Sequence, residues 1–233
     1  MQSLTELLAA FLADGEHSVI SITGAGGKTS TLTSLGRYFK AAGRSVLLTT
    51  TTKIQSPSIY DFHTDFVFTD EAEALMHEPV KGQSVFFAQR HIMDPKKTVA
   101  PRLEVLSVLV RRYDIVLIEA DGARGLPLKY HTQRDPVILK ETTATLAVMG
   151  AAAFGETVDN VCFGFDSSAV VEDRFINFLI SDSQGVLKGA RGKTMVLINQ
   201  ADEKPVSIAN ISCPVPLVTG SVLRDEIYER HGI

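Results

Sequence analysis

Residues Ser18 to Leu35 read SVISITGAGGKTSTLTSL, and this stretch decides the fold. Apolar residues at 19, 20 and 22 predict a buried strand, and the apolar residues after position 30 recur at helical spacing. Glycines in the turn between them let backbone N–H groups approach an anion closely, and the helix N-terminus and a lysine ammonium add positive charge. The sequence therefore predicts that nucleotide phosphates bind to Gly24, Ala25, Gly26, Gly27, Lys28, Thr29 and Ser30.

This glycine turn is shorter than the usual phosphate-binding loop. The pattern G-x-x-x-x-G-K-[ST] places its first glycine at the position of Ile22, whereas this chain has Gly24. An ordinary strand-to-helix connection is the alternative interpretation. The strand, the additional glycines and the helix, all in register, favour phosphate binding, and the Thr29 hydroxyl is then available to Mg²⁺.

Further apolar runs alternate with amphipathic helices along the chain. The predicted strands are 44–48, 65–68, 84–88, 114–118, 146–149, 195–198 and 216–218, and the predicted helices are 3–12, 101–112, a segment around 171–179 and 222–231. Fully apolar strands indicate a parallel sheet covered on both faces. We expect an α/β three-layer sandwich with a mainly parallel sheet, similar to P-loop NTPases, and a single nucleotide-binding domain over residues 1–233.

Composition narrows the class of protein. The chain has 233 residues, 45% of them hydrophobic, and a formal net charge of −4. No broad basic field is present, so nucleic acid is disfavoured as the main partner. No apolar segment approaches the ~18 residues that cross a bilayer, no basic region precedes the first helix, and Cys162 and Cys213 are far apart. We therefore expect a cytoplasmic protein without a membrane partner.

Acidic and basic residues follow the apolar run that ends at position 118. Ligands of parallel sheets bind beyond the carboxyl ends of the strands. Glu119 there resembles the carboxylate that binds Mg²⁺ in nucleotide sites, and Asp121 shares its face of the strand, where it would position water or an acceptor. The alternative is a pair of turn acids before a glycine. Arg124 and Lys129 follow and would neutralise an anionic substrate, unless they are solvated surface charges.

Two other strand ends carry polar residues. Thr51, Thr52 and Lys53 end the second predicted strand and would face the acceptor, although strand propensity alone also explains threonines. Asn199 and Asp202 follow the strand 195–198, at the point where guanine-nucleotide proteins carry Asn-Lys-x-Asp. Glutamine replaces the lysine here, so adenine and guanine both stay open, and an ordinary turn is the alternative. No histidine pair has the spacing of zinc ligands.

With these motifs the chain resembles the YqeC family, described as accessory proteins for selenium-dependent molybdenum hydroxylases. The resemblance is carried by ITGAGGKTS, LLTTTTK, IEADGARGLPLK and, more weakly, by DPVI and INQAD. Family members commonly have glutamate where this chain has Asp135 and lysine where it has Gln200. The resemblance implies a nucleotide-powered role in maturing the molybdenum cofactor or inserting selenium, with the cofactor or a molybdenum hydroxylase as partner.

The glycine loop is also similar to that of the Mur ligases. That similarity implies Thr29 and Glu119 as metal ligands and Lys28 as the group that neutralises phosphate charge, with ATP or GTP and Mg²⁺ as the cofactors. Two hypotheses follow. The first is a Mg²⁺-dependent NTP hydrolase or phosphoryl or nucleotidyl transferase, in which Lys28 and Asp121 are the catalytic residues. The second is a nucleotide-controlled, metallochaperone-like switch that binds a client enzyme with little turnover.

Overall fold

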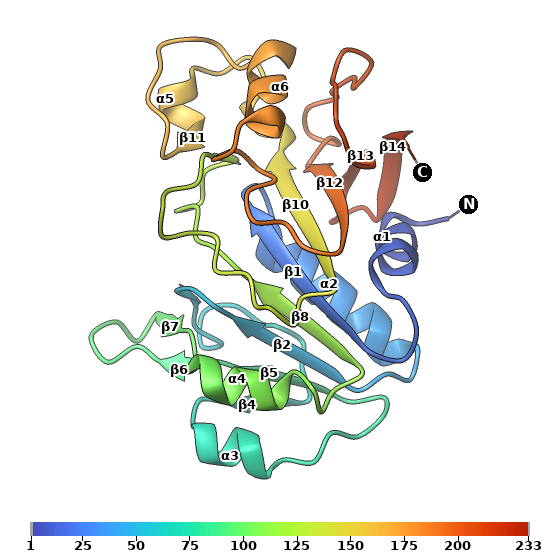
Figure 1. The fold of residues 1–233 in the computed structure, drawn as a ribbon, viewed down its shortest axis with the longest axis vertical. Coiled ribbons are helices and arrows are strands. Elements are labelled where there is room, and N and C mark those ends of the chain that lie inside the picture. The colour runs from blue at the N-terminus through green and yellow to red at the C-terminus, as the bar shows by residue number, and fades with distance from the viewer. Residues whose placement is uncertain (1, 233) are drawn as a thin grey trace.

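The computed structural model describes residues 2–232 and shows a nine-stranded sheet between layers of helices (Figure 1). The strands of this sheet are β1 (Ser18–Gly24), β2 (Val46–Thr50), β4 (Phe66–Phe68), β5 (Ser84–Phe87), β8 (Ile115–Glu119), β10 (Ala144–Gly150), β12 (Lys193–Asn199), β13 (Leu217–Ser221) and β14 (Glu226–His231). Their order is β14-β13-β12-β10-β1-β8-β2-β5-β4, and every adjacent pair is parallel except β13 and β14.

Six α-helices and two small sheets complete the described part of the chain. The helices are α1 (Leu4–Leu12), α2 (Lys28–Ala41), α3 (Glu71–Met76), α4 (Leu103–Leu109), α5 (Val158–Val161) and α6 (Asp173–Ser181), with a 3₁₀ turn at Ala151–Ala153. One small sheet has the order β3-β7-β6 and the other pairs β11 with β9. Their strands are β3 (Ile54–Gln55), β6 (Gln89–Arg90), β7 (Lys97–Val99), β9 (Leu128–Lys129) and β11 (Cys162–Phe163).

Alternation of side chains across the sheet produces the layers. Ile20 and Ile22 of β1 face α1 and α2, together with alternate residues of the neighbouring strands. Val19 faces the opposite side, which α3 and α4 cover near β2, β5 and β8, while α5 and α6 cover it near β10 and β12. Both faces are therefore buried, which explains the continuous apolar runs. The predicted three-layer α/β sandwich with a mainly parallel sheet is confirmed.

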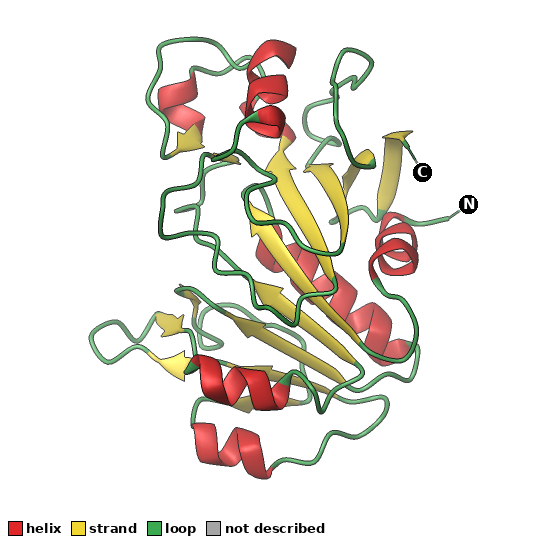
Figure 2. Cartoon of the chain, in the orientation of Figure 1, coloured by secondary structure: helices red, strands yellow, loops and turns green. Residues whose placement is uncertain are grey.

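The strand order places a topological switch point at β1. From β1 the chain moves to β2, β4 and β5 on one side, returns to β8, and then crosses β1 to reach β10. The segment between β8 and β10 contains no helix and lies as loop beside the sheet, apart from β9 (Figure 2). Register brings Gly24 beside Val148 and Ile22 beside Glu119. Polar residues that follow these strands consequently meet at one edge, where ligands of such sheets bind.

The helix predicted over 222–231 is wrong. Residues Glu226–His231 instead form β14, antiparallel to β13, after a turn in which Asp225 has a left-handed backbone with φ 57°. Ile227 packs against the core while its neighbours Glu226 and Tyr228 are exposed, which is the two-residue period of an edge strand. The carboxylate of Asp225 accepts a hydrogen bond from the Thr5 N–H at 2.7 Å, so this turn caps the start of α1.

Helix α1 has the predicted start. Its N-cap Ser3 accepts a hydrogen bond from the Glu6 N–H, and the Glu6 carboxylate accepts one from the Ser3 N–H, a reciprocal capping box. One face of α1, including Leu4 and Leu8, is buried against the core. Within residues 2–232, none of the helices has both the length and the apolar character that crossing a bilayer requires.

Candidate functional site

The glycine loop after β1 packs directly on the end of β10. Gly24 has φ 89°, and a Cβ there would lie 2.2 Å from the Val148 carbonyl oxygen. Gly26 has φ 75°, and its Cβ would lie 2.2 Å from the Gly150 nitrogen. A side chain at either position would collide with backbone that has no room to move. The Ala25 N–H donates to the Val148 carbonyl at 2.8 Å, so the loop is held at this distance.

The loop leaves a set of backbone donors free. Among the described residues, the N–H groups of the first three residues of α2 and of the two residues before it have no protein acceptor. The next N–H group, that of Thr31, donates to the Gly27 carbonyl at 2.9 Å. The helix begins without a side-chain cap. These free donors belong to Gly26, Gly27, Lys28, Thr29 and Ser30. Free N–H groups at the uncapped N-terminus of a 14-residue helix form an anion-binding arrangement.

The Lys28 side chain is buried beside two carboxylates. Its Nζ donates to the Gly24 carbonyl at 2.7 Å and lies 3.1 Å from Asp121 Oδ1 and 3.9 Å from Glu119 Oε1. Register of β1 with β8 places these acids next to the loop. The ammonium therefore has compensating charge in the absence of a ligand.

Glu119 ends β8 and touches the start of α2. Its Oε2 accepts a hydrogen bond from the Thr29 hydroxyl at 2.8 Å. Burial raises the pKa of Glu119 above its ordinary value, and this effect outweighs the opposing influence of Lys28 and Thr29. A carboxylate and a hydroxyl side by side are oxygen groups of the kind that Mg²⁺ binds in proteins. Among residues 2–232, no group of three or more His, Cys, Asp or Glu side chains is arranged around a metal position.

Asp121 lies at the centre of a buried polar network. Its Oδ2 accepts hydrogen bonds from the Gly24 N–H at 2.8 Å and from His131 Nε2 at 2.7 Å, and it lies 3.7 Å from Lys129 Nζ. Burial by itself raises the pKa of Asp121, but Lys28, His131 and Lys129 outweigh it and lower the pKa to about 2. The carboxylate is ionised at neutral pH and binds the glycine loop to the β8–β10 segment.

His131 is a member of this network that the sequence did not reveal. The side chain is 1% exposed, and its two ring nitrogens face Asp121 Oδ2 and the Gly185 carbonyl, the latter at 2.8 Å. The ring thus connects the β8–β10 segment to a second part of the chain. Gly185 comes from the turn after α6, more than fifty residues further along the chain. No local pattern around His131 indicates that contact.

A cavity of about 1170 Å³ opens in front of these groups. Its walls come from the glycine loop, the end of β2, the β3–β7 sheet and the β8–β10 segment. Nine of the residues predicted from sequence line it, namely Gly26, Gly27, Lys28, Thr29, Ser30, Thr52, Lys53, Glu119 and Arg124. Lys97, Arg134, Asp135 and Phe163 line it as well and were not singled out as site residues from the sequence, although Asp135 belongs to one of the motifs.

Two predicted substrate residues lie behind the cavity wall. The Thr51 hydroxyl donates to the Val137 carbonyl at 2.7 Å. Lys129 is 1% exposed, and its Nζ donates to the Gly122 carbonyl at 2.5 Å and forms an ion pair with Asp135. Both side chains join segments of the protein and do not face the cavity.

Comparison with known proteins fits these motifs. The sequence profile of the YqeC family matches residues 20–166, more than half of the chain. The chain belongs to the YqeC family. It is 38% identical over 148 residues to a protein of Escherichia coli (strain K12) named "Uncharacterized protein YqeC", an alignment that covers 63% of this chain and 57% of that relative. The chain thus spans less than two thirds of the relative's length.

The part that matches the YqeC profile contains the glycine loop, Glu119, Asp121 and the Lys129–Asp135 segment, but ends before β12. Asn199, beyond it, is 3% exposed and acts as a brace. Its Nδ2 donates to the Gly26 carbonyl at 3.0 Å, and its Oδ1 accepts from the Val222 N–H at 2.9 Å. The side chain therefore holds the glycine loop against the turn after β13.

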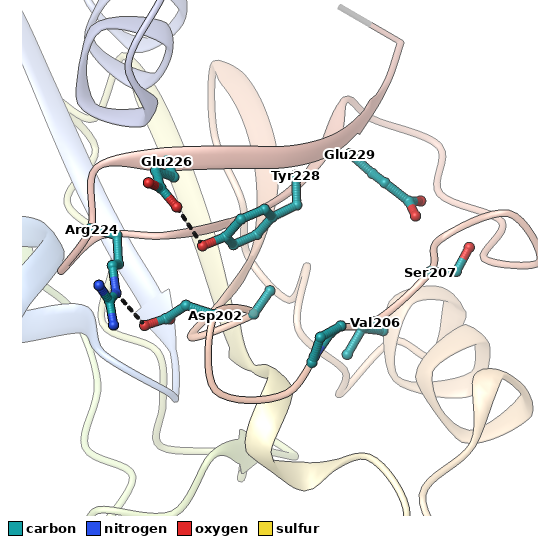
Figure 3. A pocket seen from close by; sticks show the side chains of 9 residues that line it. Asp202, Val206, Ser207, Arg224, Glu226, Tyr228 and Glu229 are labelled. Carbon is teal, nitrogen blue, oxygen red and sulfur yellow. Dashed lines mark hydrogen bonds and ion pairs between the residues drawn. The ribbon is translucent and has the colours of Figure 1, made fainter.

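Asp202 lies between two hollows near the start of α2. One, of about 340 Å³, is bounded by Ser30, Asn199 and Asp202. The other, of about 570 Å³, lies under β14, where Asp202 Oδ2 is 3.5 Å from Arg224 Nε and the Tyr228 hydroxyl donates to Glu226 (Figure 3). The first hollow is lined by Gly27 of the glycine loop, whereas the lining of the second contains no residue of that loop.

Proposed function

We propose that this protein binds a nucleoside triphosphate, ATP or GTP, with Mg²⁺ and uses it for hydrolysis or for phosphoryl or nucleotidyl transfer. The observation that carries the proposal is the set of unpaired N–H groups of residues 26–30, which border the same cavity as Lys28, Thr29 and Glu119. Backbone donors at a helix start and a neighbouring ammonium are the arrangement that binds phosphate groups. The match to the YqeC family covers residues 26–30 and Glu119 together, which supports the proposal that they belong to one site.

Each residue of the cradle has a task in this proposal. The free N–H groups bind phosphate oxygens, and Lys28 neutralises charge on the terminal phosphates. Thr29 and Glu119 would hold Mg²⁺, which would supply positive charge to offset the negative charge of the phosphates. Such a cation would also compensate the carboxylate of Glu119, whose pKa burial raises.

Asp121 acts in this proposal as a positioning residue. Its side chain has no exposure and its Oδ2 is occupied by the Gly24 N–H and by His131. An ionised carboxylate that binds the first N–H of the glycine loop fixes the loop's path. Thr52, Lys53 and Arg124 face the cavity, where they would contact the acceptor.

The biological setting comes from the family resemblance. We infer that the nucleotide chemistry assists the maturation of a selenium-dependent molybdenum hydroxylase or of its molybdenum cofactor. The nucleotide-controlled switch that binds a client enzyme is the second candidate. It is favoured by one observation, the pairing of Lys28 with Glu119 and Asp121, because a lysine already compensated by two carboxylates suits a site that waits for a partner.

Calorimetric titration of ATP and of GTP, each with and without Mg²⁺, tests nucleotide binding. Lys28→Ala is expected to abolish triphosphate binding while the unfolding midpoint stays measurable. Lys193→Ala is the matched control, because Lys193 is an exposed lysine that pairs with Asp14 at the opposite end of the sheet. Equal affinity of the Lys28→Ala variant and the wild type would remove the site assignment.

Steady-state turnover separates the two candidates. An enzyme hydrolyses or transfers phosphate groups without a client, and Lys28→Ala removes this turnover. A switch binds the triphosphate tightly and shows negligible turnover until a molybdenum hydroxylase is added. Rapid turnover of the isolated protein would exclude the switch.

A further inference from the structure

Four basic side chains around the large cavity form no ion pair in the described part of the chain, although the charge of Lys97 acts on Glu119. Lys53, Lys97, Arg124 and Arg134 all line the cavity, and none of them forms an ion pair within residues 2–232. The chain as a whole carries a net charge of −4. Positive charge that gathers in one concave region of an acidic protein attracts anions to that region.

Arg124 is held at the cavity by its backbone and by an aromatic ring. It has a left-handed backbone with φ 52° and is followed by Gly125 with φ 80°. Its guanidinium carbon lies 5.1 Å from the centre of the Phe163 ring, within cation–π distance. A non-glycine residue keeps such a backbone only where its surroundings enforce it, and strained positions of this kind gather at ligand sites.

Arg134 belongs to a second ordered turn on the same wall. The Thr132 N–H and hydroxyl donate to Asp135 Oδ1 at 2.7 and 2.8 Å, and the Arg134 N–H donates to the Thr132 hydroxyl at 3.3 Å. Buried Lys129 joins this turn to the loop of Arg124, since its ammonium pairs with Asp135 and also donates to the Gly122 carbonyl. The two arginine-bearing loops are thus fixed relative to each other before any ligand binds.

The cavity offers more room than a triphosphate tail needs. Its volume of about 1170 Å³ exceeds the roughly 300–1,000 Å³ of a pocket for one small molecule. In the proposed function, the nucleoside would occupy a separate hollow of about 340 Å³ beside Ser30 and Asp202. Free N–H groups, Lys28 and Mg²⁺ already match the phosphates of the nucleotide. Arg124, Arg134, Lys53 and Lys97 therefore exceed what one nucleotide requires.

We propose that the cavity binds a second, phosphate-bearing ligand beside the nucleotide, a phosphomonoester held by Arg124 and Arg134 and flanked by Lys53 and Lys97. This inference rests on the proposed function for the identity of the first ligand. Two guanidinium forks suit the three oxygens of a phosphate dianion, to which arginine binds with paired hydrogen bonds. Four cations without ion pairs match a ligand of charge −2 better than a monocarboxylate.

Phenyl phosphate serves as the probe, and the Nε–Hε NMR signals of the arginines report its binding. Titrations are run on the wild type saturated with Mg²⁺ and a non-hydrolysable ATP analogue, and on the nucleotide-free Lys28→Ala variant. We expect saturable shifts of the Arg124 and Arg134 signals in both proteins. Arg124→Ala and Arg134→Ala should each weaken binding at least about tenfold, the loss expected for one charge-assisted hydrogen bond.

Arg230→Ala is the matched control, because Arg230 is an exposed arginine on the edge strand β14, outside the cavity, and should leave the affinity unchanged. The inference is overturned if phenyl phosphate produces no saturable shift, if both arginine variants bind it as the wild type does, or if the dicarboxylate malonate binds equally well. Unfolding midpoints of the variants show that each remains folded. If the nucleotide does not bind but phenyl phosphate does, and its binding still needs both arginines, the proposed function is rejected and this inference is supported.

Discussion

Replacement of Lys129 by methionine is the sharpest test of the buried network. Methionine keeps the length and apolar stem of lysine and removes the ammonium, which is 1% exposed and pairs with Asp135 and, at 3.7 Å, with Asp121. Loss of one partner from a buried ion pair costs about 3–5 kcal/mol, because the carboxylates are left buried without compensation. For a chain of this size, that corresponds to a fall of roughly 6–20 °C in the unfolding midpoint.

The pH dependence of this loss follows from Asp135. Burial raises the pKa of Asp135, but the hydrogen bond and charge of Lys129 and the bonds from Thr132 outweigh it, so the pKa is lower than in the unfolded chain. Such a carboxyl group stabilises the fold above its unfolded pKa, and the contribution disappears as the pH falls through its folded value. The difference between wild type and Lys129→Met should therefore be largest at neutral pH and shrink below about pH 4.

Urea unfolding at pH 7 and at about pH 3, below the unfolded pKa of Asp135, followed by circular dichroism, measures both quantities. Lys193→Met is the control, because its exposed pair with Asp14 should contribute at most about 1 kcal/mol. A Lys129→Met protein that unfolds within about 1 kcal/mol of the wild type at pH 7 would refute the reasoning. So would a loss of stability that is the same at both pH values.

Three further substitutions probe the site. Glu119→Gln should weaken the Mg²⁺ dependence of nucleotide binding far more than binding without metal, and identical Mg²⁺ titrations of variant and wild type would remove Glu119 from the metal ligands. Gly24→Ala should destabilise the fold by at least about 1 kcal/mol and abolish triphosphate binding. The φ of 89° and the Val148 carbonyl oxygen, 2.2 Å from the position of a Cβ, leave no room for a methyl group. A triphosphate affinity that calorimetry finds unchanged would contradict this prediction. Asn199→Ala should lower the free energy of urea unfolding by about 1–3 kcal/mol, because the buried Val222 N–H loses its acceptor. It should also lower nucleotide affinity, because the Gly26 carbonyl of the glycine loop loses its donor. A variant as stable as the wild type would argue against the role of Asn199 as a brace.

The sheet and the glycine loop could be predicted because their signals are local. Strands buried on both faces produce continuous apolar runs, as at Ile115–Glu119, and a helix that starts at a glycine turn leaves its pattern within a few residues. Ile227 shows the limit of this reasoning. Its segment has apolar residues at spacings compatible with a helix, and pairing with β13 decides that it is a strand.

The buried network around the site could not be predicted in the same way. His131 and Lys129 stand in a polar stretch that is typical of a surface loop, yet both side chains are 1% exposed. Their burial depends on Gly185 and Asp121, which folding brings together from distant parts of the chain. A charged residue inside a protein is identified by its partners, and those partners are known only once the topology is known.

The contact between α1 and the turn before β14 ties the first helix to the last strand. Asp225 accepts from the Thr5 N–H and, through its carbonyl, from the Leu4 N–H at 3.3 Å, and the two segments lie side by side at the edge of the sheet (Figure 1). Loss of the turn therefore leaves two N–H donors of α1 without acceptors, and fraying of α1 leaves the acceptor oxygens of Asp225 without donors. The first helix and the last strand of the described chain are therefore expected to open together as one cooperative unit, although no covalent bond joins them.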